Sequence, residues 1–287
     1  MHAPRSNDPT AAARLHPTTT TDAAERPAPR PAGSGASAAG YTEGDVKAHV
    51  QRLTGFMMMS FLAMTLAQFI EAISNRGYVQ MNRGDFESAE NDFTQSLTLN
   101  AAQPSVLSLR AGSKLSRGDV EAAIADYRDV LKWDSKNSYG HAELGFALYF
   151  AGKTQESLAE FDKVTEIDPK LRFVLPWRYL AMLSLGQKQQ ADAKFAADLT
   201  IAKEKREWPD QLLIYLGDKQ SEQDLRKSIN NQDAKAADAQ ICEAEFFVGQ
   251  RKFVAGQKDA AKVHFAAALK SKSTQLSAYR GAKLAVK

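Results

Sequence analysis

The sequence has few of the residues from which catalytic and metal sites are built. It contains one cysteine, Cys242, which excludes an internal disulfide. Its five histidines are scattered and form neither a metal-binding pair nor an HExxH motif. Cys242 has apolar neighbours and no His-Asp or His-Asn context, so we expect a small buried thiol and not a nucleophile. We therefore predict no catalytic residue, no metal site, no cofactor and no enzymatic activity.

Residues 1–46 have few of the large apolar side chains that a folded core requires. Ala, Pro, Thr, Ser and Gly dominate this lead, which cannot bury enough apolar surface to offset the entropy of ordering it. The Gly-Ser-Gly at residues 33–35 is not followed by Lys-Ser or Lys-Thr, so it is not a phosphate-binding loop. We expect residues 1–46 to be disordered.

Long apolar runs are scarce, with one exception at residues 55–70. The run GFMMMSFLAMTLAQFI is preceded by basic residues, namely Lys47, His49 and Arg52. A basic lead, an apolar run and a small residue at Ala67 are features of a secretory signal, so residues 47–67 predict export to the periplasm. The run is short for a membrane span and 46 residues precede it, so an uncleaved anchor and a later start are alternatives. An apolar helix docked on the following repeat, in a cytoplasmic protein, is the remaining interpretation.

What the chain has instead is a regular interval of 34 residues, marked by Gly84, Gly118, Gly152 and Gly186. A small residue recurs seven positions before the first three glycines, at Gly77, Ala111 and Gly145. An aromatic residue recurs nine positions after all four, at Phe93, Tyr127, Phe161 and Phe195. Each interval therefore predicts a helix A, a turn in which glycine adopts a left-handed backbone, and a helix B packed closely against helix A.

This pattern resembles the tetratricopeptide repeat family, whose consensus is matched by GYVQMNRGDFESAENDFTQSLTLN, AGSKLSRGDVEAAIADYRDVLKWD and GFALYFAGKTQESLAEFDKVTEIDP. The fourth unit departs from the consensus, because Tyr179 replaces the small residue. The resemblance implies an all-α fold, a right-handed solenoid of antiparallel helix pairs with a C-terminal capping helix. We expect four units in residues 68–203, an irregular helical pair in 204–236, and a fifth unit with the capping helix in 237–287. In the irregular pair, one helix is expected to begin near Pro209, and Ser221 with Asp224, at a capping-box-like spacing, indicates the start of the other.

A second resemblance concerns the C-terminal half. WPDQLLIYLGD, followed by FFVGQRKFVAG, is similar to NlpI-type repeat proteins of Gram-negative envelopes. Such proteins bring hydrolases or proteases to their targets, which implies an adaptor function here. No cysteine follows the apolar run, so the resemblance does not extend to a lipid anchor.

In the family, helices A line a concave groove that binds protein or peptide partners. At the groove-facing positions this chain becomes more aromatic toward the third and fourth units, through Tyr78, Tyr139, Phe146, Tyr149, Phe150, Phe173 and Trp177. Aromatic surface gives a large contact area with few rotatable bonds, which favours recognition of a peptide or helix. We predict these residues, about half of them accessible, as partner-binding.

Arginines form a further periodic set at Arg76, Arg110 and Arg178. Asp92 and Asp126 stand 16 residues after the first two, so we predict ion pairs across those helix pairs. Lys194 occupies the matching position after Arg178, which is therefore expected to lack an acid and to contact a partner.

The carboxylate clamp known in this family is not present, because its sites hold Ser74, Tyr78, Tyr139 and Glu143. Residues 251–287 contain nine basic residues and one acid, which predicts an anionic surface as a further partner at this end. Nucleic acid is not favoured, because the aromatics and the basic run lie in different repeats.

The predicted function is a non-enzymatic scaffold of the bacterial cell envelope that holds a peptide or helix in the aromatic groove. The alternatives are an envelope component that binds cell-wall glycan or lipid through the groove and the basic end, and a cytoplasmic adaptor.

Overall fold

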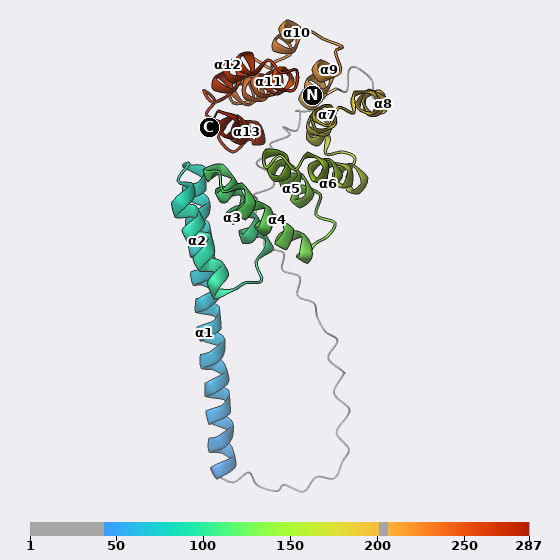
Figure 1. Cartoon of the computed structure of the whole chain (residues 1–287). Coiled ribbons are helices and arrows are strands. Elements are labelled where there is room, and N and C mark those ends of the chain that lie inside the picture. Colours follow the sequence, from blue (N-terminus) through green and yellow to red (C-terminus); the bar gives the residue numbers. More distant parts are fainter. Residues whose placement is uncertain (1–42, 201–205, 287) are drawn as a thin grey trace, which may run out of the picture. The chain divides into compact units, whose positions relative to one another are not determined.

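The computed structural model describes residues 43–200 and 206–286, and in these ranges every regular element is a helix (Figure 1). The predicted all-α fold is confirmed. The described residues divide into two parts, one ending at Ala67 and the other beginning at Gln68. Of the lead predicted to be disordered, residues 1–42 lie outside the described residues, and residues 43–46 form the start of the first helix.

Four helix pairs occupy the chain as far as residue 198. They are α1 (Glu43–Asn82) with α2 (Phe86–Leu99), α3 (Pro104–Arg117) with α4 (Val120–Trp133), α5 (Ser138–Phe150) with α6 (Thr154–Ile167), and α7 (Leu175–Ser184) with α8 (Lys188–Asp198). A short 3-10 helix, η2 (Arg172–Val174), leads into α7. We call these pairs units 1 to 4, and unit 1 uses the part of α1 from Gln68 onward.

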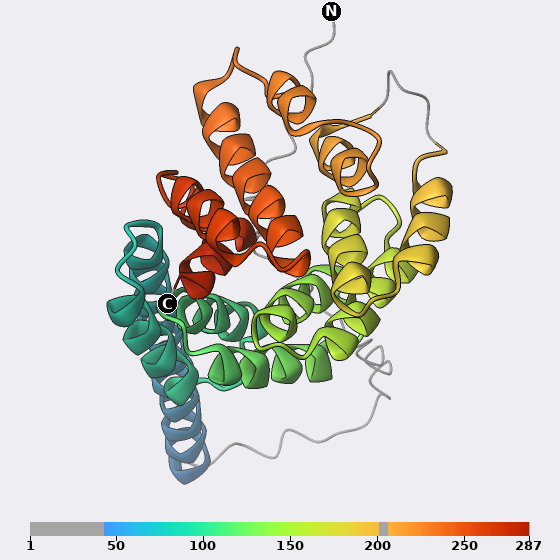
Figure 2. The same cartoon turned by 45° about the horizontal axis from the view of Figure 1, so that its top comes forward.

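The C-terminal part contains an irregular pair, a fifth unit and a last helix. They are α9 (Trp208–Leu216) with α10 (Glu222–Lys227), α11 (Ala234–Val254) with α12 (Lys258–Ala268), and α13 (Ser277–Ala285). In Figure 2, units 2 to 4 follow an arc, and α11 and α13 lie on its inner side. Both α9 and α10 begin where the sequence signals predict, since Pro209 occupies the first turn of α9 and the Ser221 hydroxyl accepts a hydrogen bond from the Asp224 N–H at 3.1 Å.

The turn glycines have the backbone that the repeat predicts. Gly84, Gly118, Gly152, Gly186 and Gly256 all have positive φ, between 73° and 105°. Among the described residues the non-glycine with positive φ is Asp218, at 60°, directly after α9. Aspartate tolerates this conformation better than most residues, so the irregular pair has a left-handed turn of its own.

Helices A and B of a unit meet at a small residue facing an aromatic ring. A Cβ added to Gly77, Gly145 or Gly249 would lie 2.9, 2.6 or 2.7 Å from the ring of Phe93, Phe161 or Phe265 respectively. These rings are buried. The glycines are therefore required by the distance between the two helices and not by backbone conformation.

In unit 4, where Tyr179 replaces the small residue, the recurring aromatic position packs against the residue that follows α9. Tyr179 is buried, and its hydroxyl donates to Asp192 Oδ1 at 2.6 Å. Its ring takes the space that a small residue would leave to Phe195. Phe195 packs instead on Gly217, where a Cβ would lie 2.8 Å from the ring. The same aromatic position thus joins unit 4 to α9.

We predict that Gly145→Ala destabilises the fold by about 1–3 kcal/mol, because the new methyl group overlaps the buried ring of Phe161. Urea unfolding followed by circular dichroism measures this. Gly112→Ala is the matched control, since its nearest neighbour would be the Tyr127 hydroxyl at an ordinary 3.6 Å. Alanine is the better helix former, so the control should change stability by less than about 1 kcal/mol, in the stabilising direction. Equal losses in both variants would contradict the packing account.

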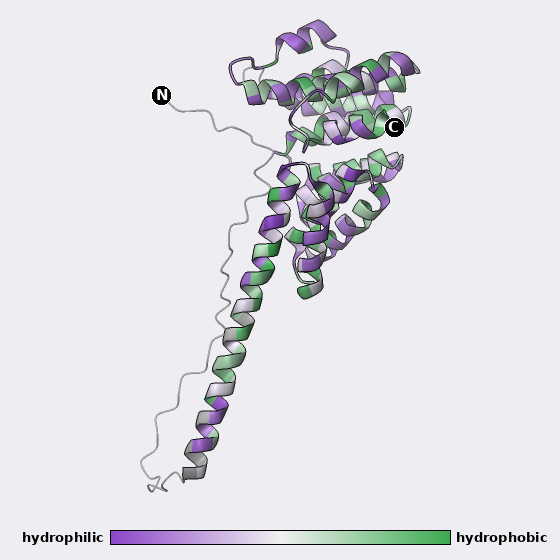
Figure 3. Cartoon of the chain, turned by 90° about the vertical axis from the view of Figure 1, so that its left-hand side faces the viewer, coloured by the Kyte–Doolittle hydropathy of each residue, from purple (hydrophilic) through white to green (hydrophobic). Residues whose placement is uncertain are grey.

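The apolar run lies within α1, which continues without a break through Ala67 and Gln68. Most of its described large side chains are exposed, and Phe56 has an exposed fraction of 72%. Figure 3 shows much of this part of α1 in the green of hydrophobic residues. Among the described residues of α1, the first buried ones are Ile70 and Ile73. By length and composition, α1 is the one helix in the described ranges that meets the requirements for crossing a membrane.

Candidate protein-binding site

The structure brings the predicted groove residues of units 3 and 4 together. The ring of Trp177 lies 4.8 Å from Phe146, 5.7 Å from Phe150 and 6.0 Å from Tyr149, measured between ring centroids. All four residues come from helices A, namely α5 and α7. We call these four the aromatic cluster.

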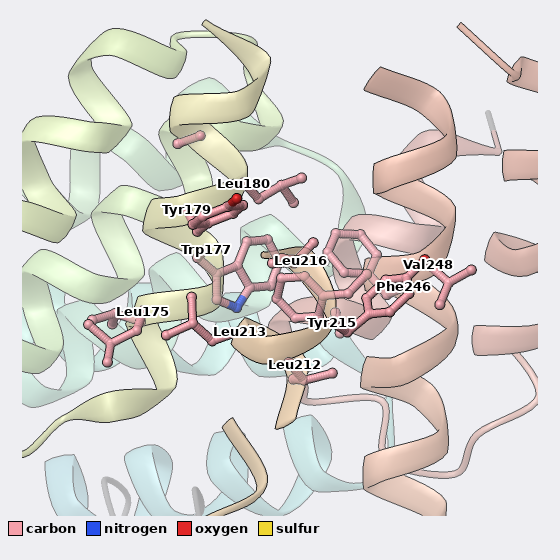
Figure 4. Packing of buried hydrophobic residues seen from close by; sticks show 14 of the residues in the cluster. Leu175, Trp177, Tyr179, Leu180, Leu212, Leu213, Tyr215, Leu216, Phe246 and Val248 are labelled. Carbon is pink, nitrogen blue, oxygen red and sulfur yellow. The ribbon is translucent and has the colours of Figure 1, made fainter. Parts of the chain in front are cut away.

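Helix α11 covers this cluster. Phe246 and Phe247 of α11 lie 5.0 and 5.1 Å from Trp177, and Leu213 and Leu216 of α9 belong to the same core (Figure 4). Trp177 and Phe146 therefore have exposed fractions of 3% and 2%. The prediction that these two residues contact a partner is wrong for this structure, because the fifth unit folds into the concave face and makes them core residues.

Tyr149 and Phe150 are half-buried at the border of the cluster. The Tyr149 hydroxyl donates to Gln250 Oε1 of α11 at 3.2 Å, and burial raises the pKa of Tyr149 to about 12. Tyr78 is also half-buried, but it packs in the separate core of unit 1. The side chains of these three residues thus pack mainly against the protein's own core.

Of the predicted groove residues, Tyr139 is exposed, and it packs against Phe173, which is half-buried. Their rings stack at 6.0 Å with an interplanar angle of 22°, and Tyr139 has an exposed fraction of 45%. Both stand 13 residues before the turn glycine of their units, so the stack repeats one position of consecutive units. Phe173 connects the pair to the aromatic cluster, with its ring 6.3 Å from Phe146. We call Tyr139 and Phe173 the aromatic edge.

Arg178 is buried and has acidic partners. Its guanidinium donates to the carboxylate of Asp198 and to Thr165 Oγ1 at 3.1 Å, and Asp162 lies 3.7 Å away. The expectation of an unpaired arginine is wrong, because Asp198, one helical turn after Lys194, supplies the acid on the same face of α8. Arg178 thus has a structural environment and not a partner-facing one.

The other predicted ion pairs are confirmed, with Arg76 Nη2 2.7 Å from Asp92 and Arg110 Nε 2.8 Å from Asp126. In units 3 and 5, a histidine and a glutamate pair across the two helices. The histidine is on helix A in unit 3 and on helix B in unit 5. His141 of α5 pairs with Glu160 of α6 at 2.5 Å, whereas in unit 5 the glutamate Glu245 lies on α11 and the histidine His264 on α12, at 2.7 Å. A shared separation of 19 residues was the signal that sequence reasoning missed.

In the described ranges, no group of His, Cys, Asp and Glu side chains has the arrangement of a metal site. Cys242 is buried as predicted, and burial raises the pKa of its thiol to about 12, which leaves it protonated and unreactive.

The basic C-terminal part is partly neutralised. Arg251 pairs with Asp218, Lys252 with Glu222 at 2.8 Å, and Arg280 with Glu143 at 3.2 Å. The exposed lysines of this part are Lys258, Lys262, Lys270 and Lys272.

Comparison with known families agrees with this geometry. Residues 70–103, which comprise the end of α1, all of α2 and the following loop, match the family model described as Tetratricopeptide repeat. A tetratricopeptide repeat is thus matched in unit 1. The left-handed turn glycines of units 1 to 5 extend the same repeat beyond the matched residues.

Several solved structures align with the chain. A tetratricopeptide repeat protein from Parabacteroides merdae has 17% identity, with 77% of this chain and all of the other covered, at a TM-score of 0.47. PilF of Pseudomonas aeruginosa has 15% identity over 72% of this chain and 93% of its own, with a TM-score of 0.44. The first repeat domain of Spaghetti (RPAP3), bound to an HSP90 peptide, has 15% identity over 45% and 94%, with a TM-score of 0.36. The resemblance to NlpI-type proteins stays a prediction.

Glu243 of α11 occupies the position that Tyr139 and Phe173 hold in their units. It accepts a hydrogen bond from the Trp208 indole at 2.7 Å, and burial raises its pKa to about 7. Between about pH 4.5 and 7 the folded protein therefore holds a proton that the unfolded chain has lost. In this window the ionisation of Glu243 lowers the free energy of unfolding as the pH rises.

We predict that wild type loses stability relative to Glu243→Gln between pH 5 and 7.5, because glutamine cannot ionise. Urea unfolding of both proteins at the two pH values measures the difference. Glu166→Gln, at an exposed position of α6, is the control and should show no such dependence. A stability difference between wild type and Glu243→Gln that is the same at both pH values would contradict the raised pKa.

Proposed function

We propose that this protein is a non-enzymatic scaffold of the bacterial cell envelope that binds a protein partner at the aromatic edge. The observation that carries the proposal is the stack of Tyr139 on Phe173, in which Tyr139 stays exposed while Phe146 and Trp177 are buried. Rigid aromatic side chains next to a packed core are the typical anchors of protein interfaces. A peptide or a helix of the partner fits such an edge.

The tetratricopeptide repeat fold supports this class of function, because stacked helix pairs present an extended surface to partners. A second candidate is an envelope component that binds glycan or lipid through the groove and the basic end. Arg251, Lys252 and Arg280 form ion pairs within the chain. The basic charges available to bind such a ligand are therefore mainly those of the exposed lysines. The aromatic edge is therefore the better-supported site.

We predict that a photoreactive phenylalanine analogue at position 139 crosslinks a partner protein in cells. The adduct should be lost in Phe173→Ala, because the stack that positions the ring is gone. The same analogue at Trp133 is the matched control. This tryptophan has an exposed fraction of 58% at the end of α4, beside Leu97 and outside the aromatic cluster. Identical adducts from positions 139 and 133, or an adduct that survives Phe173→Ala, would refute the aromatic edge as the site.

For localisation we propose that residues 53–70 are a retained membrane anchor. These 18 residues contain no charged side chain and, as a helix, span about 27 Å, close to the thickness of a bilayer core. Residues 56–76 contain neither glycine nor proline, and α1 is unbroken at the predicted cleavage point. A continuous helix favours an anchor over a cleaved signal.

We predict that the protein remains in the membrane fraction after carbonate extraction and keeps residues 53–70. Mass measurement of the purified chain tests this directly. Replacing Met58 and Leu62, which are exposed on α1, by aspartate should release the protein, since charges in the bilayer core are costly. The same double change at Val263 and Phe253, exposed residues of unit 5, is the control and should not release it. An amino terminus at Gln68 would show that the segment is a cleaved signal.

A further inference from the structure

Helix α13 has two sets of contacts. It caps unit 5 by packing on α11 and α12, and it also reaches units 1 to 3 across the concave face (Figure 2). The amide of Gln275, just before α13, donates to the Met81 carbonyl at 2.8 Å. Lys283 Nζ donates to the Ser116 carbonyl at 2.9 Å, and Arg280 Nη2 lies 3.2 Å from Glu143 Oε2. The last helix thus connects to three consecutive repeats.

In all three contacts the repeats supply the acceptor. Met81 and Ser116 lie in the last turns of α1 and α3, where the helix dipole makes a negative end. The Met81 carbonyl accepts from the Gly84 N–H at 3.0 Å as well as from Gln275. Glu143 adds a carboxylate, which is fixed by the Tyr127 hydroxyl at 2.9 Å. The concave face of units 1 to 3 is therefore a negative site for a cationic helix, the reverse of a carboxylate clamp.

The site also selects for a small residue. Gly281 follows Arg280 on α13, and a Cβ there would lie 2.6 Å from Phe150 and 2.7 Å from Phe246. Only glycine lets the helix approach these two rings so closely. A helix that takes this position needs arginine, then glycine, and lysine two residues further on.

The contact is not optimised for stability. Arg280 has an exposed fraction of 6%, yet its Nε has no hydrogen-bond partner. Its distances to the Glu143 oxygens, 3.2 and 3.4 Å, exceed those of strong charge-assisted hydrogen bonds. Buried ion pairs of this kind contribute little net stability. Another helix with better geometry would compete for the same acceptors.

We propose that the concave face of units 1 to 3 is a receptor for an arginine-bearing helix of a partner protein, and that α13 is its occupant in the free protein. The partner helix carries the Arg-Gly-x-Lys pattern that α13 shows at residues 280–283. Binding displaces α13 from Glu143, Met81 and Ser116 and puts the glycine of the partner helix in the place of Gly281, against Phe150 and Phe246. The proposal rests on the scaffold function and names the chemistry of one partner.

The test uses a labelled peptide of residues 273–287 and the full chain in detergent. Gln275→Ala combined with Lys283→Ala removes two of the three contacts but keeps Arg280 and Gly281, so the capping contacts persist. Fluorescence anisotropy should show peptide binding at least about tenfold tighter than to wild type, because the fraction with an open site rises. Adding Glu143→Lys to this variant should abolish binding, and a peptide with Arg280→Glu should bind the lysine-bearing receptor better than the wild-type peptide does.

Circular dichroism verifies that each variant is folded. A folded double variant that binds the peptide no tighter than wild type overturns the proposal, as does binding that survives Glu143→Lys. Concentration-dependent dimers of the double variant without peptide binding would assign the site to α13 of a second copy and equally overturn it. Crosslinks from position 139 that persist in either case would leave the scaffold function intact, so the two failures are distinguishable.

Discussion

The close approach of helices A and B at a glycine and an aromatic ring is the contact on which the rest of the structure depends. Gly145 against Phe161 and Gly249 against Phe265 leave no room for a single added methyl group. This distance sets how each helix pair is formed, and stacking of the pairs follows from it. Where the small residue is lost, at Tyr179, the ring of Phe195 moves to Gly217 and links unit 4 to the irregular pair.

That link has consequences for the concave face. It continues the array into α9, and the next pair places α11 against the aromatic cluster of units 3 and 4. The aromatic residues that line a groove in an open array are here the core that holds the fifth unit. The partner sites that we propose are therefore the aromatic edge and the acceptors that α13 covers, and not the whole length of the concave face.

Much of the fold could be predicted from the sequence, because its signals act over short separations. The turn glycines, the small and aromatic positions, the Arg76 and Arg110 ion pairs and the capping of α10 all involve residues within 16 positions of one another. The partner-binding residues were predicted less well. Trp177, Phe146 and Arg178 hold the expected positions on helices A, but residues that the repeat pattern does not relate to them fill the space in front of them.

The sequence by itself determined the helix pairs, their register and the left-handed turns, since each depends on contacts within one repeat. Only the tertiary structure decided which face of the array stays open. That choice depends on α11 and α13, whose contacts join residues as far apart as Gln275 and Met81, 194 positions along the chain. A periodic pattern specifies how neighbours pack, but the accumulated rotation of several units determines which distant helices meet.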